Sequence, residues 1–395
     1  MFTQFLYNKK IKLGAFALSI VVCLVFLVQM YGKAYREHGY DFTSYLLSTK
    51  ALLQGTNPYA TGSPYTFIYP LFLPAVLIPL VLIPYWSANL IWFFLGIGSM
   101  LTAIACLIEA QRSSVTYSWI SFKEKSFVPL ILVLFLFLNV IQNNVLNGQV
   151  NFIVICLCCA FLFFYLHQKN VMAAVMLASA IALKLTPFIF IFFLVVERKF
   201  MIIIQTLIFF VIMVILLPFC FVGNQIVPWY SNYIQSVLLH AVNNSPPERA
   251  PELFFSIPGF IQYVHPGMFD GGWVASLSTM FVLGACMFVH RTYLLGDRSQ
   301  TVRNFLLYLV SILLITPMSE THHLAMLLVP CAVLVYDVVQ GILPDDKLWR
   351  WSASTFIVMY LLGTRYEELP FLFFAVLVVY FFLIKATVRP IFKNS

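Results

Sequence analysis

The chain has 395 residues, of which 62% are hydrophobic and 10% charged, with a formal net charge of +8. Soluble domains carry about 25% charged residues, so this composition excludes a soluble globular protein and indicates an integral membrane protein. The cations are dispersed and form no basic patch, which excludes nucleic acid as a partner.

The first predicted span runs from Ile11 to Tyr31 and follows Lys9, Lys10 and Lys12. Its apolar length exceeds that of a signal-peptide core, and no small-residue cleavage site follows it, so we expect it to be retained. Because positive residues stay on the cytoplasmic side, we predict a cytoplasmic N-terminus in the plasma (inner) membrane.

Residues 32–86 are expected to form the first outer loop, with interfacial helices. Asp41 opens a segment with helical spacing of apolar residues, and Gly55 and Pro58 end it. Residues 67–84 are apolar but contain four prolines, which disfavour a continuous spanning helix. We therefore interpret this proline-rich segment as re-entrant.

The later spans are apolar runs without the alternation of barrel strands. They are predicted at 87–108, 127–141 and 150–166, then as two half-helices around Lys184, a span at 201–222, a large outer loop at 223–271 and four further crossings. The fold class is thus an all-α polytopic membrane protein with about 10–13 membrane helices, half-helices included. Residues 1–395 form a single domain, because no polar stretch is long enough to fold separately.

Charge counting supports this topology, in which both termini are cytoplasmic. Seventeen of the 23 lysines and arginines then face the cytoplasm, as the positive-inside rule requires. If residues 67–84 crossed the membrane instead, 14 of these 17 would lie on the wrong side.

Lys184 lies within an apolar run, three residues before Pro187. A lysine at the centre of a membrane helix costs about 2.5–3.5 kcal/mol, so such a charge is tolerated mainly beside a cavity, a partner or the interface. Pro187 breaks the helix at this point. Lys184 is therefore either a side chain that extends to the interface or a point charge that binds phosphate.

The polar residues collect on the outer face in this topology, whereas the inner loops are ordinary basic flanks. This contrast predicts an extracytoplasmic active site. Its candidate residues are Asp41, Tyr59, Tyr69, Asn147, Gln149, Asn151, Lys184, Arg249, His322 and His323.

Two interpretations stay open for most of these residues. Asp41 is either a helix N-cap or a catalytic base, and the amides of Asn147, Gln149 and Asn151 either cap a turn or bind a hydroxylated ligand. Gly148 permits the tight turn between them.

The remaining candidates carry similar alternatives. Arg249 is a surface charge or a group that closes over a phosphate. His322 and His323 are interfacial hydrogen bonders or donors to an anionic leaving group. Tyr59 and Tyr69 belong to an interfacial aromatic belt or stack on sugar rings.

Several short motifs, spread over residues 41–330, resemble those of glycosyltransferase family 87. They are Asp41 … Leu53-Gln54-Gly55-Thr56-Asn57-Pro58-Tyr59 … Tyr69-Pro70, Gly148-Gln149-Val150-Asn151, Lys184-Leu185-Thr186-Pro187 and Pro317 … His322-His323. The resemblance implies a GT-C type fold with an active site at the outer surface. It also implies a polyprenyl-phosphate sugar as donor, Asp41 as base and Lys184 as a contact to the donor phosphate.

The function expected from this resemblance is transfer of a hexosyl residue, with mannose favoured, to a hydroxyl of a glycolipid or glycan acceptor in the cell envelope. A single displacement would invert a β-linked donor to an α-linked product. We expect no cofactor and no metal, and membrane lipids as the surroundings. The alternatives are a lipid-linked glycan flippase or other transporter, and an outer-face polysaccharide polymerase or ligase.

Overall fold

The computed structural model describes residues 8–111, 126–239, 255–265, 272–294, 297–316, 320–366 and 369–388. Every regular element within these ranges is a helix, which confirms the all-α polytopic fold. Six helices are long and apolar enough to cross a membrane. They are α2 (Lys9–Ala34), α5 (Tyr85–Gln111), α11 to α13 (Phe200–Tyr233), α16 (Gly272–Thr292), η6 with α18 (Thr321–Gln340) and α20 (Phe371–Val388).

A seventh candidate span is broken. The segment predicted to span from 127 to 141 divides at Phe137 into α6 (Phe127–Leu136) and α7 (Leu138–Asn147), which are bent by 62°. The span expected at 127–141 is therefore bent near its end. On α7, Asn144 is buried and contacts the site described below, whereas Asn139 is exposed. Phe137 is fully buried at the bend and its ring packs on Tyr360, with centroids 5.1 Å apart.

Shorter apolar helices account for the half-helices expected around Lys184. They are α9 (Asn170–Leu183) and, after the break, η1 (Thr186–Ile189) with α10 (Phe190–Val196). The proline-rich segment forms α4 (Phe72–Val81), whose 10 residues span about 15 Å and cannot cross a bilayer core of about 30 Å. The remaining helices of the described bundle include α8 (Asn151–Leu166), α17 (Arg298–Ile315) and α19 (Lys347–Arg365).

Part of residues 223–271, expected to be an outer loop, is helical. Helix α11 (Phe200–Val211) continues through the π-helical turn η2 (Ile212–Leu216) into α12 (Leu217–Val222). After η3 (Gly223–Gln225) the chain forms α13 (Ile226–Tyr233), η4 (Ile234–Leu239) and later α15 (Ile257–Val264). The apolar helical stretch continues past Gly223 to Tyr233, beyond the predicted end of this span at residue 222.

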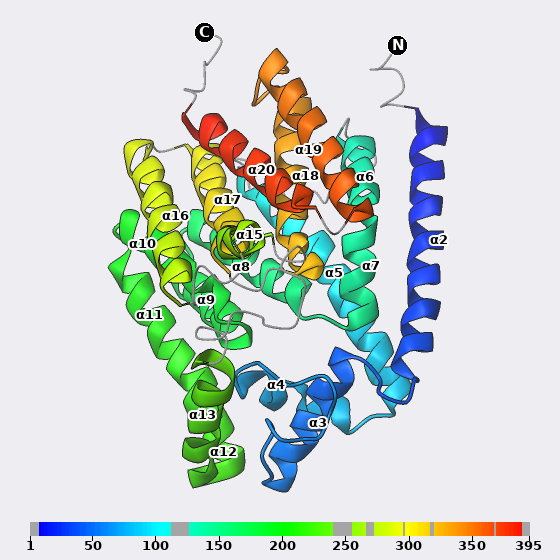
Figure 1. The fold of residues 1–395 in the computed structure, drawn as a ribbon, viewed down its shortest axis with the longest axis vertical. Coiled ribbons are helices and arrows are strands. Elements are labelled where there is room, and N and C mark those ends of the chain that lie inside the picture. The colour runs from blue at the N-terminus through cyan, green and yellow to red at the C-terminus, as the bar shows by residue number, and fades with distance from the viewer. Residues whose placement is uncertain are drawn as a thin grey trace.

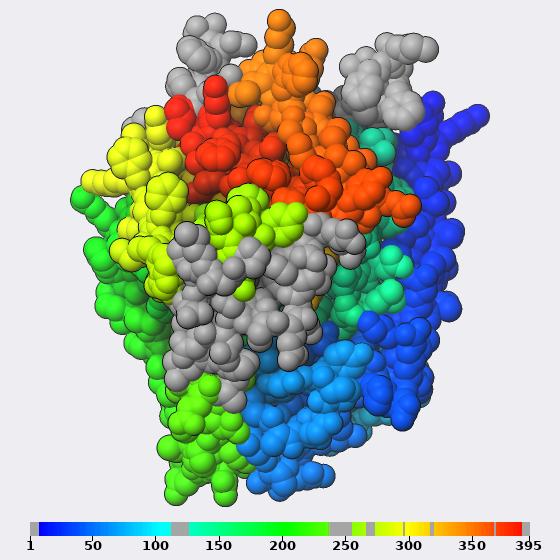
Figure 2. Space-filling view, in the orientation of Figure 1, coloured from blue at the N-terminus to red at the C-terminus, as the bar shows by residue number. Residues whose placement is uncertain are grey.

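The two ends of the molecule differ in construction. Helix α2 begins and α20 ends at one end, whereas α3 (Asp41–Gln54), α4, α12 and α13 form the opposite end (Figure 1). The segments in blue and green meet at that end in the space-filling view (Figure 2). Their contact is a small apolar cluster of Leu52, Leu71, Ala75, Ile226 and Trp229.

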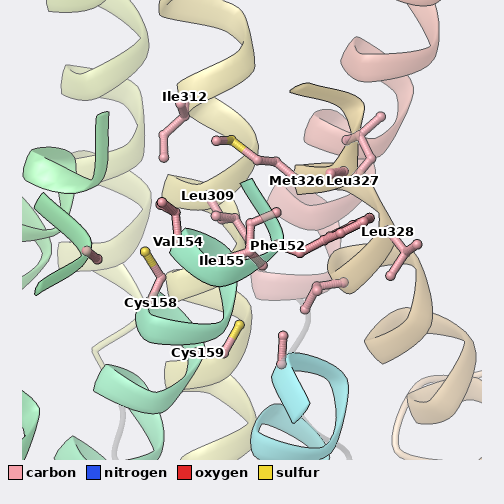
Figure 3. Close-up of a cluster of buried hydrophobic side chains, with 14 of the residues drawn as sticks. Phe152, Val154, Ile155, Cys158, Cys159, Leu309, Ile312, Met326, Leu327 and Leu328 are labelled. Atoms are coloured by element: carbon pink, nitrogen blue, oxygen red, sulfur yellow. The ribbon is translucent and has the colours of Figure 1, made fainter. Parts of the chain in front are cut away.

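The main core lies between α8, α17 and α18. Figure 3 shows Phe152 and Ile155 of α8 beside Leu309 of α17 and Leu327 of α18, all buried. Helix α8 begins with Asn151, and α18 (Ala325–Gln340) directly follows the turn η6 (Thr321–Leu324), which contains His322 and His323. This packed core therefore fixes the positions of two site residues at the ends of its own helices.

Candidate active site

Asp41 is the first residue of α3 and does not cap it. The N-cap is Tyr40, which is extended, and its backbone N–H donates to Thr43 Oγ1 at 3.2 Å. The N-cap interpretation of Asp41 was therefore wrong, and its carboxylate is free for contacts outside the helix.

Gly148 brings a second segment against the start of α3. Helix α7 ends at this glycine with φ +63°. A Cβ here would lie 2.5 Å from the Tyr40 ring and 2.8 Å from Phe42 Cβ. Trp92 Nε1–H donates to the Gly148 carbonyl at 3.0 Å. Only glycine fits both this backbone conformation and this close approach.

The approach of Gly148 lets Gln149 reach Asp41. Gln149 Nε2 donates to Asp41 Oδ2 at 2.6 Å. The Tyr69 hydroxyl donates to Gln149 Oε1 at 3.5 Å, and the Tyr45 hydroxyl donates to that of Tyr69 at 3.3 Å. We name these four residues, Asp41, Gln149, Tyr69 and Tyr45, the Asp41 group.

The surroundings of the Asp41 carboxyl raise its pKa. Burial raises its pKa to about 6, although the positive charge of Lys33 and the hydrogen bond from Gln149 act in the opposite direction, while the charge of Glu320 adds to the rise. Within the described residues, Oδ1 accepts no hydrogen bond. A carboxylate with this pKa and one open oxygen is suited to general-base chemistry.

Lys184 lies at the break between α9 and η1. Its backbone is extended, with φ −153° and ψ 129°, and Pro187 follows within the first turn of η1. Lys184 Nζ lies 2.9 Å from Asn151 Oδ1 and 2.9 Å from His323 Nε2. The break thus directs the only lysine of these half-helices toward α8 and η6.

The turn η6 (Thr321–Leu324) supplies the other side of this group. Glu320 N–H donates to His323 Nδ1 at 3.0 Å, and the His322 ring lies 4.1 Å from that of His323. Asn144 Nδ2 donates to the His322 carbonyl at 2.8 Å. Lys184, Asn151, Asn144, Glu320, His322 and His323 are the Lys184 group.

The segment Gly148–Asn151 connects the two groups. Gln149 binds Asp41, and Asn151, two residues later, binds Lys184. Because two residues span at most about 7 Å, the carboxylate and the amine are both tied to one short stretch of backbone. The structure thereby brings together seven of the ten predicted site residues. The other three of these seven are Tyr69, His322 and His323.

Three predicted residues do not join these groups. The Tyr59 hydroxyl donates to the Tyr69 carbonyl at 3.1 Å and its ring stacks on Tyr233, so it supports Tyr69. Asn147 accepts a hydrogen bond from Lys33 and donates to Asn143. Arg249 lies outside the described residues.

The sequence interpretation did not single out Lys33, Asn144 or Tyr45. Lys33 ends the first span on the side of Asp41, and its cationic charge at that boundary was the available signal. Asn144 belongs to the same asparagine-rich turn as Asn147, but helical spacing alone does not tell which amide faces the site. Within the described ranges, no three His, Cys, Asp or Glu side chains are placed to hold a metal ion.

Comparison with known proteins identifies a family. The sequence profile of glycosyltransferase family 87 matches residues 67–330, which include the Gly148–Asn151 segment, Lys184 and His323. Asp41 and Tyr59 precede the matched region. No curated protein and no solved structure matches the chain. Because the match covers well over half of a chain with six apolar spanning helices, this protein belongs to glycosyltransferase family 87 and is a membrane glycosyltransferase.

Proposed function

We propose that this enzyme transfers a hexosyl residue, with mannose as the first candidate, from a polyprenyl-phosphate sugar to a hydroxyl of a glycolipid or glycan acceptor. The transfer takes place on the extracytoplasmic face. One observation carries the proposal: Asp41 and Lys184 are held by Gln149 and Asn151, two residues apart in a single turn.

The base side of the reaction is assigned to Asp41. Its open Oδ1 accepts the proton of the acceptor hydroxyl as that oxygen attacks the anomeric carbon. Gln149 fixes the other carboxylate oxygen, and Tyr69 fixes Gln149. Orientation of this kind is a large part of what an active site contributes to rate.

The leaving-group side is assigned to the Lys184 group. Departure of the lipid phosphate leaves negative charge, which Lys184 and His323 stabilise. Attack from the Asp41 side and departure on the Lys184 side make a single displacement. The anomeric centre is then inverted, and a β-linked donor gives an α-linked product.

The alternatives differ in how they fit the family. Membership in a glycosyltransferase family favours sugar transfer over transport by a flippase. A polymerase or ligase would also use lipid-linked sugars, but its acceptor would be a growing polysaccharide, so the choice of acceptor separates these two activities.

The experiment is transfer by the purified protein from radiolabelled polyprenyl phosphomannose to a panel of glycolipid and polysaccharide acceptors. We expect an α-linked product from the lipid donor and none from a nucleotide sugar. Transfer from a nucleotide sugar would refute the donor class. Absence of transfer from every polyprenyl phosphohexose tested would refute the proposal as a whole.

A further inference from the structure

The hydrogen bonds of His323 fix which of its ring nitrogens carries a proton. Its Nδ1 lies 3.0 Å from the backbone nitrogen of Glu320. A backbone N–H is only a donor, so Nδ1 must be the acceptor and carries no proton. A neutral imidazole then has its proton on Nε2.

This assignment constrains Lys184, whose Nζ lies 2.9 Å from His323 Nε2. An ammonium group has three donors and no acceptor. A charged Lys184 would therefore place one of its N–H groups against the Nε2–H of His323, with no acceptor between them. An uncharged amine has a lone pair that accepts the Nε2 proton. The amine can still donate to Asn151 Oδ1 at 2.9 Å, so it satisfies both contacts.

The surroundings of Lys184 favour the same form. Among the described residues, no carboxylate lies within ion-pair distance of its amine, and Asn151 is neutral. The other ionisable groups of the Lys184 group are His323, His322 and Glu320, and the Glu320 carboxylate is 3.7 Å from His322 Nδ1. Burial disfavours the charged form of Lys184 more than the negative charge of Glu320 favours it, and an uncharged amine avoids this cost.

We infer that Lys184 is an uncharged amine in the ligand-free site, and that binding of an anionic phosphate diester is coupled to uptake of one proton by this amine from solvent. The ligand class rests on the proposed function. After the proton arrives, the ammonium of Lys184 and the Nε2–H of His323 both donate to the phosphate. The site becomes cationic only when its countercharge is present.

Binding of two probes tests this inference in the Asp41→Asn protein, in which transfer should be slow and the Asp41 carboxyl is absent. The probes are polyprenyl phosphomannose and farnesyl methyl phosphate, a sugar-free diester of constant charge. Calorimetry in buffers of different ionisation enthalpy measures the protons taken up. We expect uptake of about one proton per bound probe near pH 9. We also expect the Kd of each probe to rise up to tenfold per pH unit between pH 7 and 9.

An ordinary lysine stays charged throughout this range, so binding without proton uptake would overturn the inference while leaving the proposed function intact. Failure of both probes to bind would overturn the inference that this site takes a phosphate diester, whereas the proposed function is tested separately by the transfer assay with the other polyprenyl phosphohexoses.

Two variants locate the proton. Lys184→Arg carries a permanent charge, so its binding should be independent of pH. In His323→Gln the amide oxygen accepts from a charged Lys184, so the pH dependence should also be lost. Proton uptake retained in Lys184→Arg would place the proton on another group, such as His322, and would overturn the assignment to Lys184.

Discussion

Gln149 donates from Nε2 to Oδ2 of Asp41 at 2.6 Å, across a separation of 108 residues. Three features produce this contact: the extended Tyr40 that starts α3, the close approach of Gly148, and the hydroxyl of Tyr69 on the far side of the amide. The carboxylate is oriented by the rest of the fold and not by its own helix.

Replacement of Asp41 by Asn should lower the rate of sugar transfer by about 10²- to 10⁴-fold, because the amide cannot accept the hydroxyl proton. Radiolabelled transfer at saturating donor measures the loss, and donor affinity should change little. The exposed Glu37→Gln is the matched control and should keep full activity. Near-normal transfer by Asp41→Asn would remove Asp41 from the base role.

The rate should depend on pH through the ionisation of Asp41. The base must be ionised, and its pKa is raised to about 6, so the rate at saturating donor should rise with pH through about 6. Lys33 lowers this pKa by its charge, so Lys33→Gln should shift the midpoint of the kcat/KM profile to higher pH. Lys50→Gln, at an exposed position further along α3, should leave the midpoint unchanged. A shift to lower pH in Lys33→Gln would contradict the assignment.

Gly148→Ala should lose both activity and thermal stability. The added methyl meets the Tyr40 ring at 2.5 Å, and the left-handed backbone costs a further 1–2 kcal/mol, roughly, for any L side chain. Gly55→Ala separates the two effects, because Gly55 has φ +68° but nothing within 4 Å of its Cβ position. Thermal unfolding in detergent and a transfer assay compare the variants. Equal losses of activity and stability in Gly148→Ala and Gly55→Ala would mean that the contact with Tyr40 is unimportant.

Arg303 and Asp337 form a fully buried pair between α17 and α18, with Nη1 and Oδ2 3.7 Å apart. Removal of one partner leaves an uncompensated buried charge, so Asp337→Ala should destabilise the protein by about 3–5 kcal/mol. The double variant Arg303→Met with Asp337→Leu should recover most of the thermal stability. A double variant no more stable than Asp337→Ala would show that the pair contributes more than charge compensation.

The active site should be accessible from the extracytoplasmic side. In a background with the exposed Cys220 replaced by Ser, Thr56→Cys near the end of α3 should react with a membrane-impermeant maleimide in intact cells. Lys347→Cys, at the start of α19, should react only after permeabilisation. The opposite pattern would place Asp41 in the cytoplasm and end the proposal of an outer-leaflet donor.

The sequence determined the class of the protein, because a low charge content and long apolar runs admit only membrane helices. It also located the break at Lys184, since proline removes a backbone donor wherever it occurs. The end of α3 at Gly55 was predictable for another local reason, because glycine readily adopts the left-handed conformation that ends a helix, and Gly55 has this conformation.

Local pattern was insufficient where a segment's direction depends on its partners. The bend at Phe137 separates two stretches that both have a helical pattern, and the buried Phe137 ring packs there against Phe356 and Tyr360, which lie more than 200 residues later in the chain. Similarly, the apolar continuation through α13 was taken for a loop, because its burial comes from contact with Leu52 and Leu71 far earlier in the chain.

The composition of the site followed from sequence, but its connectivity did not. Charged and amide side chains stand out in an apolar chain because their burial is costly, which is why Asp41, Lys184 and His323 could be named in advance. The hydrogen bonds of Gln149 with Asp41 and of Asn151 with Lys184 were decided by the tertiary structure alone. Such contacts join residues more than 100 positions apart or at a helix break, where no periodicity relates them.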